Sequence, residues 1–335
     1  MATMKDVAKA AGVSIATVST TLSGASFVSS ELRARVTTAI DALGYERNST
    51  ASSLKRGKSL LIGLIVSDIT NPFFTELVDA VQNLAREKGY SVLLGISDHN
   101  VSREAELLRL MRSHQAAGTI LCPAGSTGDY SLQRLNLGKM KVVAIDNAAP
   151  ELPFDTIALD NSKAALLAVR HILSFGHMRV ATMAGPEKQY VGQERLAGYL
   201  AALEDYGIKA DSVLIQHGDF RIAHAFQACV NLLGLQHRPT ALFVANNLML
   251  IGVMQALSRA GLSVPRDISI ASIDDFPWSS AFQPALTVVQ QPISAMATAA
   301  LDHLLDRIEG NIDAPRHQSF DPELIVRQSC ASPTF

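Results

Sequence analysis

The sequence has little of what several protein classes require. Its three cysteines, Cys122, Cys229 and Cys330, lie about a hundred residues apart, which fits neither a disulfide framework nor the close ligand spacing of a zinc site. No run of residues approaches the roughly eighteen uninterrupted apolar positions of a membrane helix. No long apolar segment follows a basic N-terminus, so a secretory leader is not expected. We therefore expect a cytoplasmic protein with no metal site and no membrane partner.

The sequence also lacks the common catalytic signatures. It contains no GxxxxGK[ST] phosphate loop, no GxGxxG after a strand, no HExxH pair and no GxSxG serine elbow. The nine histidines are scattered along the chain. We therefore predict that the protein is not an enzyme, with no catalytic residues and no cofactor.

What the sequence does have is an uneven distribution of charge. Residues 1–58 contain eight Lys or Arg against four Asp or Glu, a net charge of +4, whereas the whole chain carries −2. The remainder is therefore acidic, at −6. A small basic segment joined to a larger acidic body is expected when only one part of a protein meets a polyanion such as nucleic acid.

Residues 1–45 have the signals of three short helices. Val18 and Leu22 are spaced to dock the second helix on the first. The pattern predicts a helix-turn-helix with a support helix, followed at 46–58 by a linker too poor in apolar residues to fold alone. Cap residues mark the helix ends: Thr3 with Asp6, Ser14, and Ser29 or Ser30 at the starts, Gly12 and Gly44 at the ends.

From Ser59 the pattern changes to apolar runs of strand length that alternate with helical periodicity. This alternation indicates a parallel sheet covered by helices. About nine or ten such units are too many for one open sheet, so we predict two doubly wound lobes over 59–335, with a ligand cleft at the carboxyl ends of their strands. The expected strands include LLIGLIV, SVLLGIS, TILCPA, KVVAID, TIALD, RVATMAG, SVLIQHGD, TALFVAN and SIASIDD.

Motifs along the whole chain resemble those of the LacI/GalR family of transcriptional repressors. They include TMKDVAKAAGVSIATVSTTLSG, ALGY, SSLKRGKS and IGLIVSDITNPFF, then GHMRVATMAGP, ERLAGY, RPTALFVANN, VPRDISIASIDD, PALTVVQQP and LIVRQS. The resemblance implies an α/β protein with an N-terminal helix-turn-helix head and a two-lobed, periplasmic-binding-protein-like body of doubly wound parallel sheets. One lobe would comprise about 60–159 and 291–319, the other about 160–290 and 320–335. It also implies a homodimeric repressor that binds a near-palindromic, double-stranded DNA operator.

The resemblance assigns DNA contacts to the head and linker. Ile15, Ala16 and Thr20 match the positions that face base edges, and Thr17 and Ser19 match positions closer to phosphates. Apolar Ile15 and Ala16 can at best contact thymine methyl groups, so we expect less stringent readout of the major groove. The alternative is that Ile15 packs inward.

In the linker, Leu54 matches the leucine that the family inserts into the minor groove, and Lys55 can contact phosphate. Arg47 and Ser52 stand where the family usually has Pro and Arg, which makes folding of the linker less favourable.

The body resembles periplasmic pentose-binding proteins at their ligand positions. Aromatic faces with convergent amides and carboxylates are the usual chemistry of sugar binding, and we expect a small-molecule effector, a sugar, between the lobes. Asp146 would replace an acidic group missing near Gly125, which leaves pentose against hexose open. The matching positions are Asn71, Phe73, Phe74, Arg195, Phe220, Asn246, Asp274 and Gln290.

Two other interpretations remain open. The same regulator could respond to a purine or a sugar phosphate. The body alone would also fit a sugar-binding transport protein, although the basic head and the missing leader argue against that function.

Overall fold

The structure is a computed structural model that describes residues 2–22, 28–45, 59–130, 135 and 137–333. The chain divides into two compact units, Met1–Ser59 and Leu60–Phe335. We call the first unit the head and the second the body, and we describe each by itself.

In its described residues, 2–22 and 28–45, the head forms three helices whose ends lie at the predicted cap residues. The Thr3 side chain accepts a hydrogen bond from the Asp6 backbone and Asp6 caps in return, while Gly12 ends the first helix in the left-handed conformation, φ 63°. Ser29 caps the third helix, which ends at Gly44. The predicted helix-turn-helix is confirmed, with α1 at Met4–Ala11, α2 at Ile15–Leu22 and α3 at Ser30–Leu43.

A small apolar cluster holds the three head helices together. Val7, Val18 and Val36, one from each helix, have no exposed surface. The Arg35 side chain on α3 donates a hydrogen bond to the Ala11 carbonyl at the end of α1, 2.6 Å away. These contacts fix α2 against α1 and α3 and leave its other face toward solvent.

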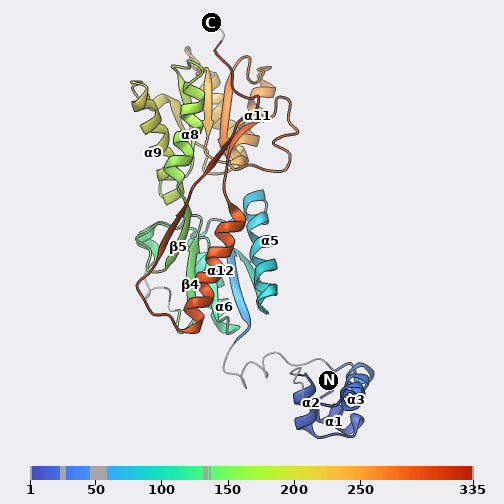
Figure 1. The fold of residues 1–335 in the computed structure, drawn as a ribbon. Helices are drawn as coiled ribbons and strands as arrows, with labels where there is room; N and C mark the ends of the chain where they lie inside the picture. Colours follow the sequence, from blue (N-terminus) through green and yellow to red (C-terminus); the bar gives the residue numbers. More distant parts are fainter. Residues whose placement is uncertain (1, 23–27, 46–58, 131–134, 136, 334–335) are drawn as a thin grey trace. The chain divides into compact units, whose positions relative to one another are not determined.

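The body contains two six-stranded sheets within the described residues (Figure 1). The first has the order β11-β5-β4-β3-β1-β2 and the second β12-β10-β9-β8-β6-β7, and every described pairing except β10 with β12 is parallel. We call the two halves lobe 1 and lobe 2. This arrangement confirms the predicted α/β class.

The elements of lobe 1 are β1 (Leu61–Val66), α5 (Pro72–Glu87), β2 (Ser91–Ile96), α6 (Val101–Ser113), β3 (Gly118–Leu121), a 3₁₀ turn η1 (Thr127–Asp129), β4 (Lys141–Ile145), β5 (Asp155–Leu159), α12 (Ile293–Glu309) and β11 (His317–Phe320). Those of lobe 2 are α8 (Asn161–Leu173), β6 (Val180–Ala184), α9 (Tyr190–Asp205), η2 (Ser212–Leu214), β7 (Ile215–His217), α10 (Ile222–Leu233), β8 (Ala241–Val244), α11 (Asn247–Arg259), β9 (Ser269–Ile273), β10 (Thr287–Gln290) and β12 (Glu323–Ile325).

Both faces of the lobe 1 sheet are buried. Leu64 and Val66 face a core made with α5 and α12, whereas Ile65 between them faces a second core that includes Leu108 and Met111 of α6. Alternate side chains of one strand therefore pack on opposite faces of the sheet. This explains why the strands read as continuous apolar runs.

Lobe 2 has one continuous core, in which α8 packs over strands β8, β9 and β10. Cys229 and Cys330 lie in this core, and all three cysteines are buried and unpaired. Burial raises the pKa of both Cys229 and Cys330 to about 12, so these thiols stay protonated at neutral pH.

The chain passes between the lobes at three places: from β5 into α8, from β10 into α12, and from β11 into β12 (Figure 1). The last passage spans only Asp321 and Pro322. Three short connections allow the lobes to change their angle without unfolding either sheet.

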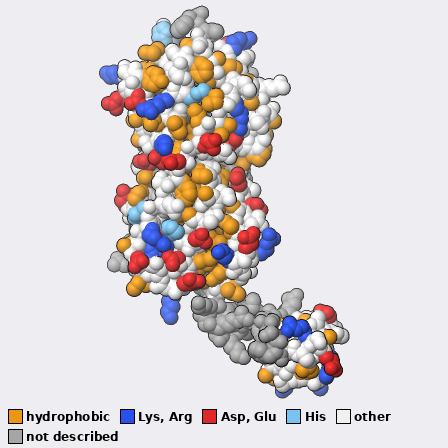
Figure 2. Space-filling view, in the orientation of Figure 1, with side chains coloured by type: hydrophobic (Ala, Val, Ile, Leu, Met, Phe, Trp, Pro, Cys, Tyr) orange, Lys and Arg blue, Asp and Glu red, His pale blue; other side chains and the backbone are white. Residues whose placement is uncertain are grey.

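Charged and hydrophobic side chains are mixed on the visible face of the body (Figure 2). Figure 2 shows basic and acidic side chains spread over the visible face, with acidic ones gathered at the level where the lobes meet. Among the described residues, no helix is long and apolar enough to cross a membrane.

Candidate functional site

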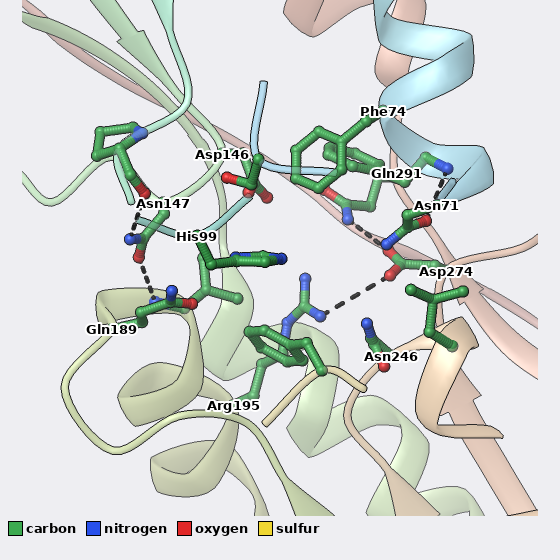
Figure 3. A pocket seen from close by; sticks show the side chains of 16 residues that line it. Asn71, Phe74, His99, Asp146, Asn147, Gln189, Arg195, Asn246, Asp274 and Gln291 are labelled. Carbon is green, nitrogen blue, oxygen red and sulfur yellow. Dashed lines mark hydrogen bonds and ion pairs between the residues drawn. The ribbon is translucent and has the colours of Figure 1, made fainter. Parts of the chain in front are cut away.

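A cavity lies between the two lobes at the carboxyl ends of their strands, as expected for doubly wound sheets. Residues that follow β1, β4, β6 and β9 all contribute to its wall. Figure 3 shows their side chains converging from both lobes. Of the positions proposed from sequence, those that line the cavity are Asn71, Phe73, Phe74, Asp146, Arg195, Phe220, Asn246 and Asp274.

Gln290 does not line the cavity, and the structure corrects this prediction by one residue. Gln290 is the last residue of β10, where it pairs with Glu323 of β12, and it is exposed. Gln291 is buried instead, and its Nε2 donates a hydrogen bond to Asp274 Oδ1 at 2.5 Å. Neighbouring residues at the end of a strand point to opposite sides, so the position of the strand end decides which glutamine faces the cleft.

Arg195 lies at the centre of the lobe 2 wall. It comes from α9, is only 3% exposed, and donates through Nε to Asn161 Oδ1 at 2.8 Å and through Nη1 to the Ala245 carbonyl. The same Nη1 lies 3.9 Å from Asp274 Oδ2, and the guanidinium carbon is 5.8 Å from the centre of the Phe220 ring. These contacts hold a cation in one place inside the cleft.

One carboxylate from each lobe faces the cavity. Asp146 directly follows β4 and Asp274 directly follows β9. Burial raises the pKa of Asp146 to about 7; Arg195 lowers it and Asp274 raises it further. Burial also raises the pKa of Asp274, while Arg195 and the Gln291 side chain lower it. The two groups can accept hydrogen bonds from ligand hydroxyls on opposite sides of the cleft.

Aromatic rings cover the apolar surfaces of the cavity. Phe73 and Phe74 at the start of α5 meet edge to face, with centroids 5.0 Å apart, and both also pack into the lobe 1 core. The Asn71 side chain caps this helix by accepting from the Phe73 backbone. The Phe220 ring lies over Gly185, where an added Cβ would be 2.3 Å from the ring, so glycine makes room for it.

The lobes also contact each other directly beside the cavity. Asn247 of lobe 2 donates a hydrogen bond to Asn71 of lobe 1 at 3.0 Å. The Val191 backbone donates to Asn147 Oδ1 at 3.2 Å, and Asn147 in turn donates to the Pro123 carbonyl. Hydrogen bonds between the two lobes therefore help to hold this arrangement.

Several lining residues escaped the sequence reasoning. His99, Asn147 and Gln189 all face the cavity, as Figure 3 shows. Each lies in a loop after a strand. Polar residues are common in such loops, so nothing in the sequence distinguished these three from ordinary turn residues. The signal that could have found them is the repetition of such positions in the two lobes.

In the head, α2 presents the residues proposed to contact DNA. Ile15 is 48% exposed and Ala16 is exposed, whereas Val18 is the buried residue of the helix. The alternative that Ile15 packs inward does not hold in this structure. The proposed DNA-contacting residues of α2 keep part of their surface accessible: Ile15, Ala16, Thr17, Ser19 and Thr20.

The threonine hydroxyl groups of α2 make local hydrogen bonds. The Thr17 hydroxyl pairs with Ser14 Oγ at 2.9 Å, and the Thr20 hydroxyl donates to the Ala16 carbonyl at 2.8 Å. Leu54 and Lys55 of the linker, with Arg47 and Ser52, lie outside the described residues. Among the residues that are described, no group of three or more His, Cys, Asp or Glu could hold a metal ion.

Comparison with known proteins identifies the family. Residues 3–48 match the bacterial regulatory proteins of the lacI family, and residues 169–330 match the periplasmic binding protein-like domain. The chain is 36% identical over 329 residues to the HTH-type transcriptional repressor CytR of Escherichia coli strain K12, covering 98% of this chain and 96% of the relative.

Two solved structures extend the similarity to the fold. The Lac repressor dimer bound to operator and the anti-inducer ONPF aligns with a TM-score of 0.88 at 28% identity, covering 98% of this chain and 99% of that one. A LacI family transcriptional regulator from Enterococcus faecium with bound ribose aligns with a TM-score of 0.72 at 26% identity, covering 82% and 100%. The chain therefore belongs to the LacI family of bacterial regulatory proteins: it is a DNA-binding transcriptional regulator controlled by a small-molecule effector, and not an enzyme.

Proposed function

We propose that the effector is a small neutral sugar held between the lobes. The observation that carries the proposal is the placement of two carboxylates, Asp146 and Asp274, on opposite sides of the buried guanidinium of Arg195. Carboxylates accept hydrogen bonds and a guanidinium donates them, so together they match a ring of hydroxyl groups. The faces of Phe74 and Phe220 complete the cavity with apolar surface.

The same charges argue against an anionic effector. A phosphate in the cavity would meet Arg195 but also Asp146 and Asp274. In a site largely closed to water, either carboxyl group would repel the phosphate strongly in its ionised form, and only protonation, which burial favours at both groups, would relieve the repulsion. The effector contacts proposed from sequence are therefore retained, with Gln291 in place of Gln290. The ribose bound to the related Enterococcus faecium regulator is in keeping with this class of ligand.

We further infer that the protein acts as a cytoplasmic homodimer on a near-palindromic operator, because a two-fold protein requires two-fold DNA. The proposed domains are the head at 1–45, the linker at 46–58 and the body at 59–335. The membership of β11 in one sheet and β12 in the other supports the proposed lobe boundary near residue 320. The effector regulates by binding one arrangement of the lobes more tightly than the other.

A thermal-shift panel tests the ligand class. The panel comprises D-ribose, D-xylose, D-glucose, D-galactose, ribose 5-phosphate, adenine and adenosine. A ligand at about 100 times its Kd adds roughly 2.7 kcal/mol of stability, which corresponds to a rise in Tm of about 5 °C or more for a body of this size. We expect such a rise with a neutral sugar. A rise with only the phosphate or the free purine would overturn the sugar proposal and leave the regulator intact.

Leu54→Ala tests the linker. If Leu54 inserts between base pairs, its truncation removes the apolar wedge that bends the duplex, and operator affinity should fall about tenfold or more. Affinity for the sugar should not change. The measurement is fluorescence anisotropy on an operator selected from random DNA. Leu60→Ala, which truncates an exposed leucine at the start of the body, is the matched control. Equal DNA affinity of both variants and the wild type would exclude the wedge.

A further inference from the structure

The two lobes repeat one strand order, with matching strand directions except at the outermost strands β11 and β12. In both sheets the strand that comes first in the chain lies next to the edge, and the second strand forms that edge: β1 and β2 in lobe 1, β6 and β7 in lobe 2. By the same order, β4 corresponds to β9. Corresponding strand ends therefore face each other across the cleft, and the residues after them can be compared position by position.

Two pairs of cavity residues already follow this correspondence. Asp146 and Asp274 are each the first residue after their strand, and both have left-handed backbone, with φ 69° and 74°. Asn71 and Gln189 each directly precede the helix that follows the first strand of their lobe, α5 after β1 and α9 after β6, and both line the same cavity. The cleft is thus built from matched contributions of the two lobes.

The loops after the edge strands form a third pair. Asp98 and His99 are the second and third residues after β2, and Asp219 and Phe220 are the second and third after β7. All four have positive φ, between 52° and 56°. Two consecutive left-handed residues that are not glycine are unfavourable, and such outliers concentrate at functional sites. The shared conformation turns both His99 and Phe220 into the cavity.

The surroundings of His99 leave its ring available for a ligand. Figure 3 shows the imidazole reaching into the space between Asp146 and Arg195. Figure 3 draws no hydrogen bond or ion pair between His99 and the other cavity side chains. Burial lowers the pKa of His99 and Arg221 lowers it further, against the opposite effects of Asp68 and Asp98. A neutral imidazole offers one donor and one acceptor.

An ion pair joins the two loops across the mouth of the cleft. Arg221, which follows Phe220, places Nη2 3.9 Å from Asp98 Oδ1, beside His99. Both partners are exposed, so the pair contributes little to stability. It does bring the His99 loop of lobe 1 to the Phe220 loop of lobe 2.

We infer that His99 is an effector-binding residue of lobe 1, the counterpart of Phe220 in lobe 2, and that its imidazole selects effectors with a hydroxyl group at the edge next to Asp146. The inference rests on the proposed sugar effector. A hydroxyl can donate to one atom and accept from another, so it can bridge the carboxylate and the imidazole. An effector that lacks this hydroxyl leaves the imidazole unpaired in the cleft.

Isothermal titration of variants with paired ligands tests the inference. The ligands are the panel sugar that most raises the Tm and its monodeoxy analogues. The variants are His99→Ala and His99→Asn, because asparagine tolerates positive φ and keeps a donor and an acceptor. His114→Ala, which removes an exposed histidine at the end of α6 in the same lobe, is the control.

We expect His99→Ala to weaken sugar binding about tenfold or more, His99→Asn to weaken it less, and His114→Ala to leave it unchanged. One deoxy analogue should bind the wild type poorly. Its affinity should not fall further in His99→Ala, because the missing hydroxyl and the missing imidazole are the two partners of one hydrogen bond. Wild-type affinity in His99→Ala, or deoxy penalties identical in the two proteins, would overturn the inference alone. If no sugar binds the wild type, the proposed function fails and the inference falls with it.

Discussion

Arg195→Ala is expected to lower effector affinity by about 100-fold, and with it the effector's control of DNA binding. Removing a buried charged partner costs about 2–5 kcal/mol, because the groups it served are left unpaired. For affinity, the groups left unpaired are those of the effector that Arg195 would contact; within the protein, Asn161 Oδ1, the Ala245 carbonyl and the Asp274 carboxylate also lose this partner, which lowers stability. Titration calorimetry with the panel sugar measures the loss, and operator binding with and without sugar measures the response.

Two controls separate ligand binding from general damage. Arg195→Lys keeps the charge but cannot donate in two fixed directions, so it should bind sugar better than the alanine variant and worse than the wild type. Arg170→Ala removes an arginine whose ion pair with Asp205 on α9 is exposed, and it should change neither affinity nor stability by more than about 1 kcal/mol. A folded Arg195→Ala protein that still responds to sugar would remove Arg195 from the site.

Asp155→Ala is expected to destabilise the body by about 3–5 kcal/mol, the usual effect of breaking a buried ion pair. The Asp155 side chain has no exposed surface and accepts from Arg307 Nη2 at 2.5 Å and from Arg316 Nη2 at 3.1 Å. These contacts tie the start of β5 to α12 and to the segment before β11. The variant leaves two arginines without their shared partner in the part of lobe 1 where three segments distant in sequence meet.

Urea unfolding at different pH values measures this effect. The arginines hold the pKa of Asp155 at about 2, below its usual value of 3.8, although burial alone would raise it. Because the folded-state pKa is lowered, the stabilisation is fully present above about pH 4 and is lost as the pH falls toward 2. The difference between wild type and variant should therefore shrink in acid. Asp321→Ala, which breaks the exposed pair with Lys163, should have little effect at any pH.

Local signals made the head predictable. The capping box at Thr3 and Asp6 and the terminal glycines at positions 12 and 44 depend on contacts within one helical turn. Such contacts do not depend on the rest of the fold, so the sequence alone predicts the helix ends. In the body, buried parallel strands such as β1 and β9 were visible as apolar runs. The strand β11 was not, because its residues His317–Phe320 lie at a sheet edge and are mostly exposed.

The site was predictable where a motif fixed the position and not where the fold did. Asn71 and the two phenylalanines follow from one short stretch in which a cap, a proline and a helix start determine their direction. Gln290 and Gln291 differ only in where β10 ends, which depends on pairing with β12, a strand more than thirty residues away. His99 needed the order of both sheets, because only then does its loop correspond to that of Phe220.

The direct hydrogen bonds between the lobes affect which arrangement of the lobes the protein adopts when no effector is bound. Each bond, such as Asn247 to Asn71, contributes a net of about 0.5–1.5 kcal/mol, and every kilocalorie changes an equilibrium constant about fivefold. These bonds bias the population of lobe arrangements before any ligand arrives, and the apparent affinity for a ligand scales with the fraction of molecules already competent to bind. We therefore expect substitution of these amides, which lie outside the head, to change both the basal expression of the controlled genes and the effector concentration at which the regulator responds.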